Sequence, residues 1–415
     1  MRLNPNIKEI TALKRIIVNK SIVMLESGES AMAIIQGFSL ATKIIFGAGS
    51  LRELPAAGRA FGSKVLLVAG KKALLKSGIW PRLISQLNEA GFTVTEFAAV
   101  EPEPSLDTVR KGLETARQNK VDWVAGIGGG SAIDVAKTIA GLFYTPNNVE
   151  FYFRGGKIER EGLPLIAIPT TSGSGAEVTF NAVLTDPETQ IKQSIRDIRL
   201  AAKVALVDPE LTYSAPQTVT AYSGMDALVQ AIEAYTSKGA NSFTDIYAYA
   251  AIERIAANLA ASFRNGRDVK ARSEMAMGSL MAGIAFSNAR LGAVHGMAHP
   301  VGTKSGKPHG LVCAVLLAPV MQFNMPVCLE KYARIAPVFG LPARPGKETD
   351  AAQEVIRAIS ALQNELGIPW RLRDLGIGEA DLEAIVAESL PSGSLKANPR
   401  EATPDDLLQI LKEAL

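Results

Sequence analysis

From about residue 39 onward, short runs rich in β-branched residues alternate with longer segments of helical periodicity. The run 64–69 is apolar throughout, which is typical of a strand whose sheet is covered by helices on both faces. We expect further strands over 41–46, 92–97, 123–127, 164–169 and 204–208, and helices over 50–54, 80–89 and 105–118. Ser50 and Ser105 are the expected N-caps of two of these helices. This β-α-β-α order predicts a parallel, doubly wound sheet.

The pattern changes after Pro209, where strand-like runs become scarce. Alanine-rich segments with helical periodicity cover 220–235, 245–261, 269–287, 349–366 and 379–389. The fold class predicted is therefore α/β, with an N-terminal parallel-sheet domain followed by an all-helical C-terminal domain. We place the α/β domain at 39–210 and the helical domain at 211–415, with an N-terminal extension over 1–38.

Composition narrows the class of protein. The 44 basic and 41 acidic residues are interspersed and give a formal charge of only +3. The sequence therefore predicts no broad positive surface that would bind nucleic acid or an anionic membrane. A small anionic ligand remains compatible with this balance. The two cysteines form no CxxC motif, and no apolar run approaches the ~20 residues that span a bilayer. We expect a cytoplasmic protein without nucleic-acid or membrane partners.

The three histidines of the chain, His295, His299 and His309, fall within 15 consecutive positions. Histidine is the side chain best suited to bind a transition metal or to move a proton near neutral pH. Any one of them alone is more simply a core or capping residue. As a group they favour a chemical site.

Two glycine-rich turns follow predicted strands in the first half. After the strand that ends at Ile127, a helix opens with the residues Gly128, Gly129, Gly130, Ser131 and Asp134. After the strand that ends at Pro169, a hydroxyl-rich turn contains Thr170, Thr171, Ser174 and Thr179. Backbone amides at a helix start bind phosphate, although a tight turn or a capped helix start also explains each turn alone. Two such turns favour a nucleotide across the carboxyl ends of the strands.

Asp226 and Gln230 are four residues apart in a predicted helix and therefore share one face. A carboxylate that faces His295 and His309 completes the ligand set of a divalent metal with an open position. By spacing alone, the simpler role for Asp226 is that of an acidic residue near a helix start.

The motifs together resemble one family, the iron-containing (group III) alcohol dehydrogenases. They are, in order, ATKIIFGAG from residue 41, GGGSAIDVAK from 128, PTTSGSGAEVT from 169, GMDAL and AIEAY from 224 and 231, and VHGMAHP and PHG from 294 and 308. The resemblance covers about nine-tenths of the chain, from residue 39 to the C-terminus. It implies a Rossmann-like domain that binds a nicotinamide dinucleotide, and a helical domain that binds Fe²⁺ or Zn²⁺ and the substrate.

The same resemblance implies roles for single residues. Asp226, His295 and His309 match three of the four metal-ligand positions, and His299 matches a position for proton relay or cofactor contact. Asn181 and Phe286 match positions that line the substrate pocket, and Lys192 matches a basic cofactor contact.

The chain departs from the family pattern at two places. The fourth ligand position, usually histidine, is Gln230, whose amide oxygen is a poorer ligand and lowers affinity by about 10- to 100-fold. The site then holds metal through the other three ligands and water, or works without metal. Where relatives carry an aspartate that binds the ribose, this chain has Gly70 followed by Lys71 and Lys72, so that NADP(H) is favoured over NAD(H).

The predicted function is NAD(P)-dependent interconversion of a primary alcohol and its aldehyde, in a homodimer or larger homo-oligomer. The alternatives are a metal-free reductase of the same fold and a lyase that resembles dehydroquinate synthase. The lyase needs a basic pocket, whereas the residues around Asp226 and His295 are mostly apolar. A third alternative is a nucleotide-binding module without catalytic activity, in which the histidine cluster has no chemical role.

Overall fold

The computed structural model describes residues 36–71, 74, 78–189, 191–342 and 346–415. The chain divides into two units, Met1–Ser39 and Leu40–Leu415. In the first unit, residues 36–39 have no regular secondary structure, and the predicted extension lies otherwise outside the described residues, as does Lys72.

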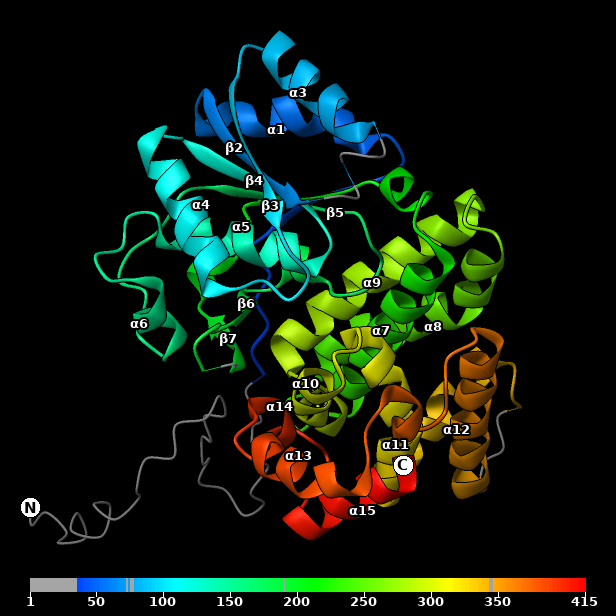
Figure 1. Cartoon of the computed structure of the whole chain (residues 1–415). Helices are drawn as coiled ribbons and strands as arrows, with labels where there is room; N and C mark the ends of the chain where they lie inside the picture. Colours follow the sequence, from blue (N-terminus) through cyan, green and yellow to red (C-terminus); the bar gives the residue numbers. More distant parts are fainter. Residues whose placement is uncertain (1–35, 72–73, 75–77, 190, 343–345) are drawn as a thin grey trace, which may run out of the picture. The chain divides into compact units, whose positions relative to one another are not determined.

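A six-stranded sheet forms the first half of this unit, in the order β1-β8-β5-β4-β2-β3 (Figure 1). All of its strand pairs are parallel, as the alternating pattern predicts. The strands are β1 (Lys43–Phe46), β2 (Lys64–Gly70), β3 (Thr93–Val100), β4 (Trp123–Gly128), β5 (Leu165–Pro169) and β8 (Val204–Val207). The parallel sheet confirms the predicted α/β class.

Helices cover both faces of this sheet, which explains why β2 is apolar throughout. Leu66 and Val68 pack into one hydrophobic cluster, with side chains of α4 (Leu106–Gln118) and α5 (Gly130–Leu142). Val65 and Leu67 point to the opposite face and pack into a second cluster, with side chains of α3 (Ile79–Glu89). Successive side chains of a strand face opposite sides, so both sets must be apolar. The remaining short helices of this half are α1 (Leu54–Gly58), α6 (Val149–Phe153), η1 (Ser50–Glu53), η2 (Arg59–Phe61), η3 (Ala176–Val178), η4 (Ile198–Leu200) and η5 (Pro209–Thr212).

The predicted N-cap at Ser50 is wrong. Ser50 is the first residue of η1, and Gly49, with φ of 75°, occupies the cap position. The carboxylate of Asp208 accepts hydrogen bonds from the backbone N–H groups of Gly49 and Leu51, at 3.0 and 2.9 Å. A side chain that is distant in sequence therefore caps this turn, and local spacing does not reveal it.

Two strands were not predicted. β6 (Asn181–Thr185) and β7 (Lys192–Arg196) form a separate antiparallel pair. Both strands are short and polar at several positions, and β7 is buried only at Ile195. Their hydrophobic signal is therefore too weak to distinguish them from a loop.

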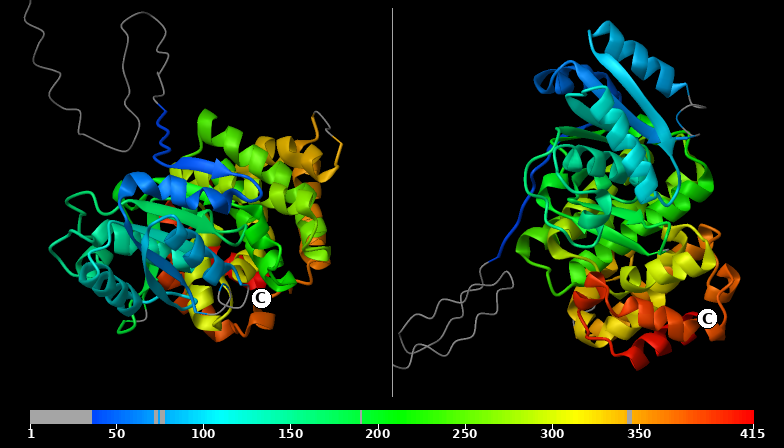
Figure 2. Two further views of the ribbon diagram at one scale, coloured as in Figure 1. Left: turned by 90° about the horizontal axis from the view of Figure 1, so that it is seen from above. Right: turned by 60° about the vertical axis from the view of Figure 1, so that its left-hand side comes forward.

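The second half is helical, and no strand occurs after Val207 in the described residues. Its helices are α7 (Gln217–Thr236), α8 (Ser242–Arg264), α9 (Val269–Ala289), α10 (Ala293–Ser305), α11 (His309–Ile335), η6 (Ala336–Phe339), α12 (Glu348–Glu365), η7 (Leu372–Leu375), η8 (Glu379–Asp381), α13 (Leu382–Ser389), α14 (Gly393–Lys396) and α15 (Pro404–Ala414). In Figure 1 and the right-hand view of Figure 2, α7–α9 lie between the sheet and the helices coloured orange to red. The prediction of an all-helical second half is confirmed.

Two helices of this half have proline inside them. Pro300 lies in α10, and Pro319 and Pro326 lie in α11. Proline normally indicates a helix boundary, so the sequence pattern did not single out these two helices. The stretch His309–Phe339 is long and apolar enough to cross a membrane, but 61% of its most apolar window is buried inside the protein. The stretch therefore also fits a core helix, which was not expected from the sequence.

A close glycine contact joins the two halves. Gly175 lies in the loop after β5 with φ of 60°, and a Cβ atom there would lie 2.6 Å from the Cα atom of Gly283 in α9. Only glycine adopts this φ readily and leaves this space. The contact brings the loop at the carboxyl edge of the sheet against α9.

Candidate metal and cofactor site

A cavity of about 1050 Å³ is lined by residues from both halves of the unit. It gathers most of the residues that the sequence predicted, namely Gly130, Ser131, Asp134, Ser174, Thr179, Asn181, Lys192, Asp226, Gln230, Phe286, His295, His299 and His309. The other predicted residues, Gly70, Lys71, Gly128, Gly129, Thr170 and Thr171, are not among its lining residues. They lie at or directly after the carboxyl ends of β2, β4 and β5.

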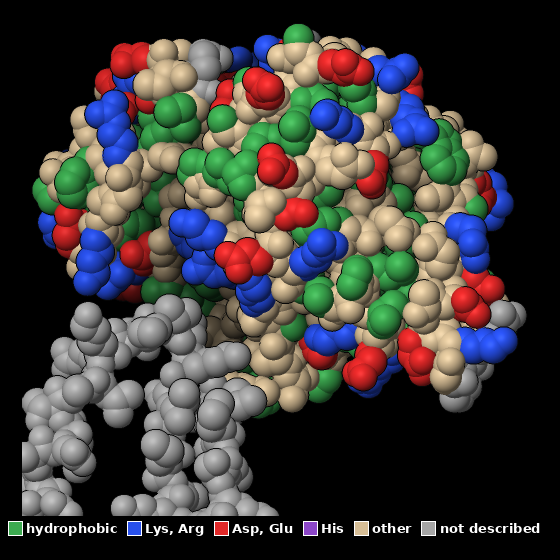
Figure 3. All heavy atoms as spheres, turned by 90° about the horizontal axis from the view of Figure 1, so that it is seen from below, with side chains coloured by type: hydrophobic (Ala, Val, Ile, Leu, Met, Phe, Trp, Pro, Cys, Tyr) green, Lys and Arg blue, Asp and Glu red, His purple; other side chains and the backbone are tan. Residues whose placement is uncertain are grey.

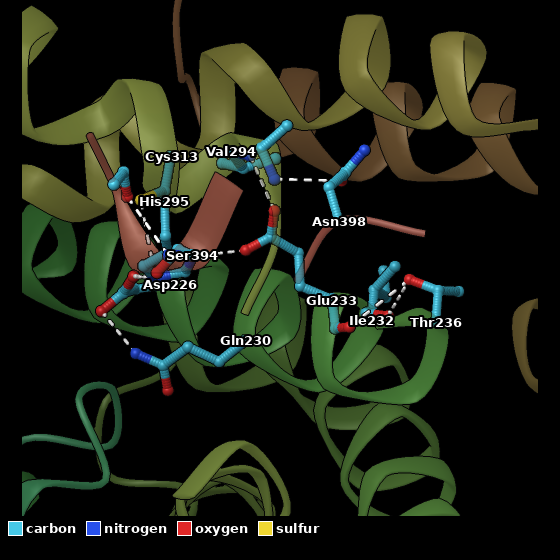
Figure 4. Close-up of polar contacts among 12 residues, drawn as sticks. Asp226, Gln230, Ile232, Glu233, Thr236, Val294, His295, Cys313, Ser394 and Asn398 are labelled. Atoms are coloured by element: carbon cyan, nitrogen blue, oxygen red, sulfur yellow. Dashed lines mark hydrogen bonds and ion pairs between the residues drawn. The ribbon is translucent and has the colours of Figure 1, made fainter. Parts of the chain in front are cut away.

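Asp226 lies in the middle of α7, so it is not a capping residue. Its Oδ1 atom lies 3.5 Å from Nε2 of His295, which comes from α10, and 3.8 Å from Nε2 of His309, which opens α11. The Asp226 side chain faces His295 in Figure 4. Three helices thus bring one carboxylate and two imidazoles together.

A fourth group joins this cluster. The Sγ atom of Cys313 lies 3.4 Å from Nε2 of His309 and 4.0 Å from Nε2 of His295. Potential ligand atoms of Asp226, His295, His309 and Cys313 all lie within 4.8 Å of one another. Sequence reasoning missed Cys313, although its spacing of four residues from His309 places both on one face of a helix.

The donor set fits a divalent metal. Oδ1 of Asp226 is buried and has no hydrogen-bond partner among the described residues. An unpaired carboxylate oxygen in the interior is costly unless a cation or donor occupies the space before it. Burial, His299 and His295 lower the pKa of His309 well below its ordinary value, which favours the neutral, metal-binding form.

Gln230 lies one turn after Asp226 on α7. Its Nε2 group donates a hydrogen bond to Oδ2 of Asp226 at 3.0 Å, and Figure 4 shows this contact. The Oε1 atom of Gln230 is buried and has no hydrogen-bond partner among the described residues. Gln230 therefore orients the carboxylate and keeps an acceptor free.

Glu233 holds His295 from behind. Its Oε2 atom lies 2.6 Å from Nδ1 of His295, and its Oε1 atom accepts the N–H of Val294 at 2.7 Å. A carboxylate that fixes the second ring nitrogen directs Nε2 toward the metal position and raises its basicity. Burial opposes the charged form of His295, but Cys313, Asp226 and Glu233 together raise its pKa well above the ordinary value. Glu233 lies in the AIEAY motif, but the sequence alone does not indicate its role.

His299 lies one turn after His295 and outside the ligand cluster. Its ring stacks on that of His309, with centroids 5.1 Å apart and an interplanar angle of 20°. Its Nδ1 atom is buried and has no partner among the described residues. Burial, Lys192 and His295 lower the pKa of His299 to about 3, so the imidazole is neutral at physiological pH.

The two glycine-rich turns lie side by side at the other end of the site. The backbone N–H of Thr170 donates to the carbonyl of Gly128 at 2.9 Å, and a Cβ atom on Gly130 would lie 2.9 Å from Oγ of Ser174. Gly128 has φ of 150°, which favours glycine. The helix α5 begins after Gly129 without a side-chain cap, and this is the arrangement in which a helix start binds phosphate.

Asp134 and Thr179 are engaged within the protein. Lys137 is fully buried, and its Nζ atom donates to Oγ1 of Thr179 at 2.6 Å and lies 3.6 Å from Oδ1 of Asp134. The N–H of Val183 donates to the other oxygen of Asp134 at 2.9 Å. This network ties α5 to β6, and Lys137 was not singled out from the sequence.

Of the remaining cavity residues, Lys192 forms an ion pair with Glu103. Asn181 has a buried Oδ1 atom without a partner among the described residues, and Phe286 is 7% exposed. Figure 3 shows basic and acidic side chains interspersed over the face that it presents. On that face the charge distribution matches the expectation from composition.

Known protein families match almost all of this unit. A model described as iron-containing alcohol dehydrogenase matches residues 41–209. A model described as the C-terminal part of the Fe-containing alcohol dehydrogenase family matches residues 220–415. The chain belongs to the iron-containing alcohol dehydrogenase family. This membership confirms the resemblance inferred from the motifs.

Individual members of this family are similar to the chain over most of their length. It is 40% identical over 363 residues to the 1,3-propanediol dehydrogenase of Citrobacter freundii, covering 85% of this chain and 94% of the relative. It is 36% identical over 384 residues to the NADPH-dependent butanol dehydrogenase of Clostridium saccharobutylicum, covering 90% and 97%. A solved structure of a 1,3-propanediol oxidoreductase superposes with a TM-score of 0.89 at 37% identity, covering 92% of this chain and 100% of the other. Membership of this family favours the predicted dehydrogenase over two of the alternatives, the lyase and the nucleotide-binding module without catalytic activity.

Replacing Glu233 with alanine tests whether this carboxylate supports the site. In metal-free protein, Glu233→Ala leaves the buried N–H of Val294 and Nδ1 of His295 without their acceptor, so the free energy of unfolding falls by about 3 kcal/mol. Urea unfolding followed by circular dichroism measures the change. Glu365→Ala, which breaks an exposed ion pair with Arg264 at 2.8 Å, is the control and costs less than about 1 kcal/mol. Equal costs for the two variants would contradict the supporting role.

Proposed function

We propose that this alcohol dehydrogenase interconverts a primary alcohol and its aldehyde by hydride transfer with a nicotinamide dinucleotide, at a divalent metal held by Asp226, His295 and His309. The observation that carries the proposal is the convergence of these three side chains on the wall of a cavity whose other wall contains the start of α5. Metal ligands and a phosphate-binding helix start thus face one space. Fe²⁺ and Zn²⁺ both suit two imidazoles and a carboxylate.

The bound metal supplies a Lewis acid that polarises the oxygen of the substrate. Residues of the chain position the metal ligands and the substrate. Glu233 fixes the ring of His295, and Gln230 fixes the carboxylate of Asp226. Phe286 provides an apolar wall that keeps water from the reacting carbon, and Asn181 offers an unpaired amide oxygen to a hydroxyl or to the carboxamide of the nicotinamide.

The residues that would hold the cofactor lie at the carboxyl edge of the sheet. The N–H groups at Gly130 and Ser131 bind its diphosphate, helped by the hydroxyl of Ser174 beside them. Gly70, at the end of β2 next to β4 in the sheet, then lies where the adenosine ribose binds. A nicotinamide held in this cavity would supply or accept a hydride at its C4 atom.

His299 is the proposed proton relay. Its neutral ring accepts a proton at one nitrogen and releases a proton from the other nitrogen. A stable imidazolium is not required, which agrees with the lowered pKa of His299. Its stacking on His309 and its position on the cavity wall support this role. The predicted homo-oligomer and cytoplasmic location stay predictions.

A screen of NADPH and NADH oxidation over short, branched, aromatic and carboxylated aldehydes tests the proposed activity. Metal content is measured on the same sample. Turnover of at least one aldehyde class, proportional to bound metal, is the expected result.

Cofactor choice is predicted to favour NADP(H), because Gly70 carries no carboxylate to repel a 2′-phosphate. A Cβ atom at Gly70 would meet only the carbonyl oxygen of Val100 at 3.7 Å, so a side chain fits there. Gly70→Asp shifts the ratio of kcat/KM for NADPH over NADH toward NADH by on the order of tenfold or more, through repulsion of the phosphate. Gly70→Asn is the neutral control and shifts the ratio much less. A wild-type preference for NADH contradicts the assignment.

The histidines are predicted to respond differently to removal. His295→Ala and His309→Ala each lose bound metal and turnover, because a ligand is gone and the remaining donors are too few. His299→Ala keeps its metal but turns over more slowly or with a changed pH profile. Metal content after gel filtration and the pH dependence of kcat distinguish the two classes. Loss of metal from His299→Ala shows that the ligands are wrongly assigned.

Metal removal is predicted to abolish turnover. Exhaustive chelation leaves the folded protein without its Lewis acid, and adding Zn²⁺ or Fe²⁺ restores activity. Circular dichroism before and after chelation checks that the fold survives. Full activity in protein shown to be free of metal favours the metal-free reductase, with the histidines acting as hydrogen-bond donors.

A further inference from the structure

Cys313 belongs to the ligand cluster, although it is not one of the cavity-lining residues. It is one turn after His309 on α11, it is fully buried, and it does not line the cavity. Gln230, in contrast, lines the cavity. Of these two residues, only Gln230 therefore borders the cavity.

The distances within the cluster fit a four-ligand metal site. Tetrahedral zinc with nitrogen or oxygen at 2.0–2.1 Å and sulfur at 2.3 Å places its ligand atoms about 3.3–3.6 Å apart. Oδ1 of Asp226 lies 3.5 Å from Nε2 of His295 and 3.8 Å from Nε2 of His309. Sγ of Cys313 lies 3.4 Å and 4.0 Å from the same two nitrogens. All four ligand atoms lie within 4.8 Å of one another, so shifts of about 1 Å bring them to ligand spacing.

A second observation indicates that a ligand belongs there. Asp226 is 7% exposed, and its Oδ1 atom, which faces the two histidines, has no hydrogen-bond partner among the described residues. A buried carboxylate oxygen that faces two imidazole nitrogens and a thiol leaves room for a cation between them. The cluster is thus more than a cysteine next to a histidine.

We propose that the thiolate of Cys313 is the fourth protein ligand of the metal, in the role that Gln230 does not fill. This inference rests on the proposed metal site and adds a residue to it. On binding, the thiol releases its proton to solvent and the sulfur donates a lone pair to the metal, so nothing is oxidised or reduced. Gln230 stays a positioning residue, holding Asp226 through the hydrogen bond of 3.0 Å.

This arrangement has two chemical consequences. With four protein ligands, a substrate oxygen would bind as a fifth ligand, and the sulfur of Cys313, which is not part of the cavity lining, would leave the cavity side for that oxygen. A soft thiolate also favours Zn²⁺ over Fe²⁺. The metal site of this chain then differs from a site made only of a carboxylate and imidazoles, both in its ligands and in the metal that it prefers.

X-ray absorption at the zinc edge of the zinc-loaded, full-length protein tests the proposal. The expected spectrum has one sulfur at about 2.3 Å together with nitrogen and oxygen at about 2.0–2.1 Å. Cys313→Ala loses the sulfur shell and binds zinc at least about tenfold more weakly. Cys328→Ala, which removes the other cysteine of the chain, keeps both the shell and the affinity. Gln230→Ala keeps the sulfur shell, because its side chain is not a ligand.

The outcomes separate this inference from the proposed function. Zinc bound to the wild-type protein with nitrogen and oxygen ligands only overturns the role of Cys313 and leaves the metal site intact. Failure of the wild-type protein to bind zinc, iron or cobalt overturns the metal site itself. If Cys313→Ala does not fold, the wild-type and Cys328→Ala spectra still decide, because a sulfur shell present in both comes from Cys313.

Discussion

The burial of α7 is the constraint on which the site depends. Asp226, Gln230 and Glu233 project from successive turns of this helix, and all three are less than 10% exposed. Burying a carboxylate costs several kcal/mol unless charge and hydrogen bonds compensate for the lost water. Glu233 is compensated by the N–H of Val294 and by His295, which both come from α10. Asp226 is compensated at one oxygen only, by Gln230.

The uncompensated oxygen of Asp226 makes the site suited to a cation. The oxygen of Asp226 that lacks a hydrogen bond faces His295 and His309, and their helices pack against α7 or against each other. In metal-free protein, the raised pKa of His295 supplies part of the missing positive charge. A divalent cation at the proposed site would supply it more fully and would displace that proton. The groups that make α7 costly to bury are therefore also the ones that we propose as metal ligands.

The sequence revealed most of the fold where hydrophobicity alone determines an element. The apolar runs of β2 and β5 predict buried parallel strands, and both are nearly or fully buried. The pair β6 and β7 was missed because its strands are short and partly exposed. The cap of η1 was misassigned because Asp208, more than 150 residues away, supplies it. Such contacts are set by tertiary structure and have no local signature.

The candidate site divides in the same way. The histidine cluster and the pairing of Asp226 with Gln230 could be inferred from residue type and helical spacing, and the structure brings these residues together. Glu233 and Cys313 could not be recognised as site residues from the sequence, because acidic residues and buried cysteines are common on helices. Only the packing of α7, α10 and α11 shows which groups these two side chains face. The distance between the glycine-rich turns and the ligand cluster is likewise a tertiary property. It depends on the approach of Gly175 to Gly283, where a Cβ atom on Gly175 would lie 2.6 Å from the Cα atom of Gly283 and would push the loop after β5 away from α9.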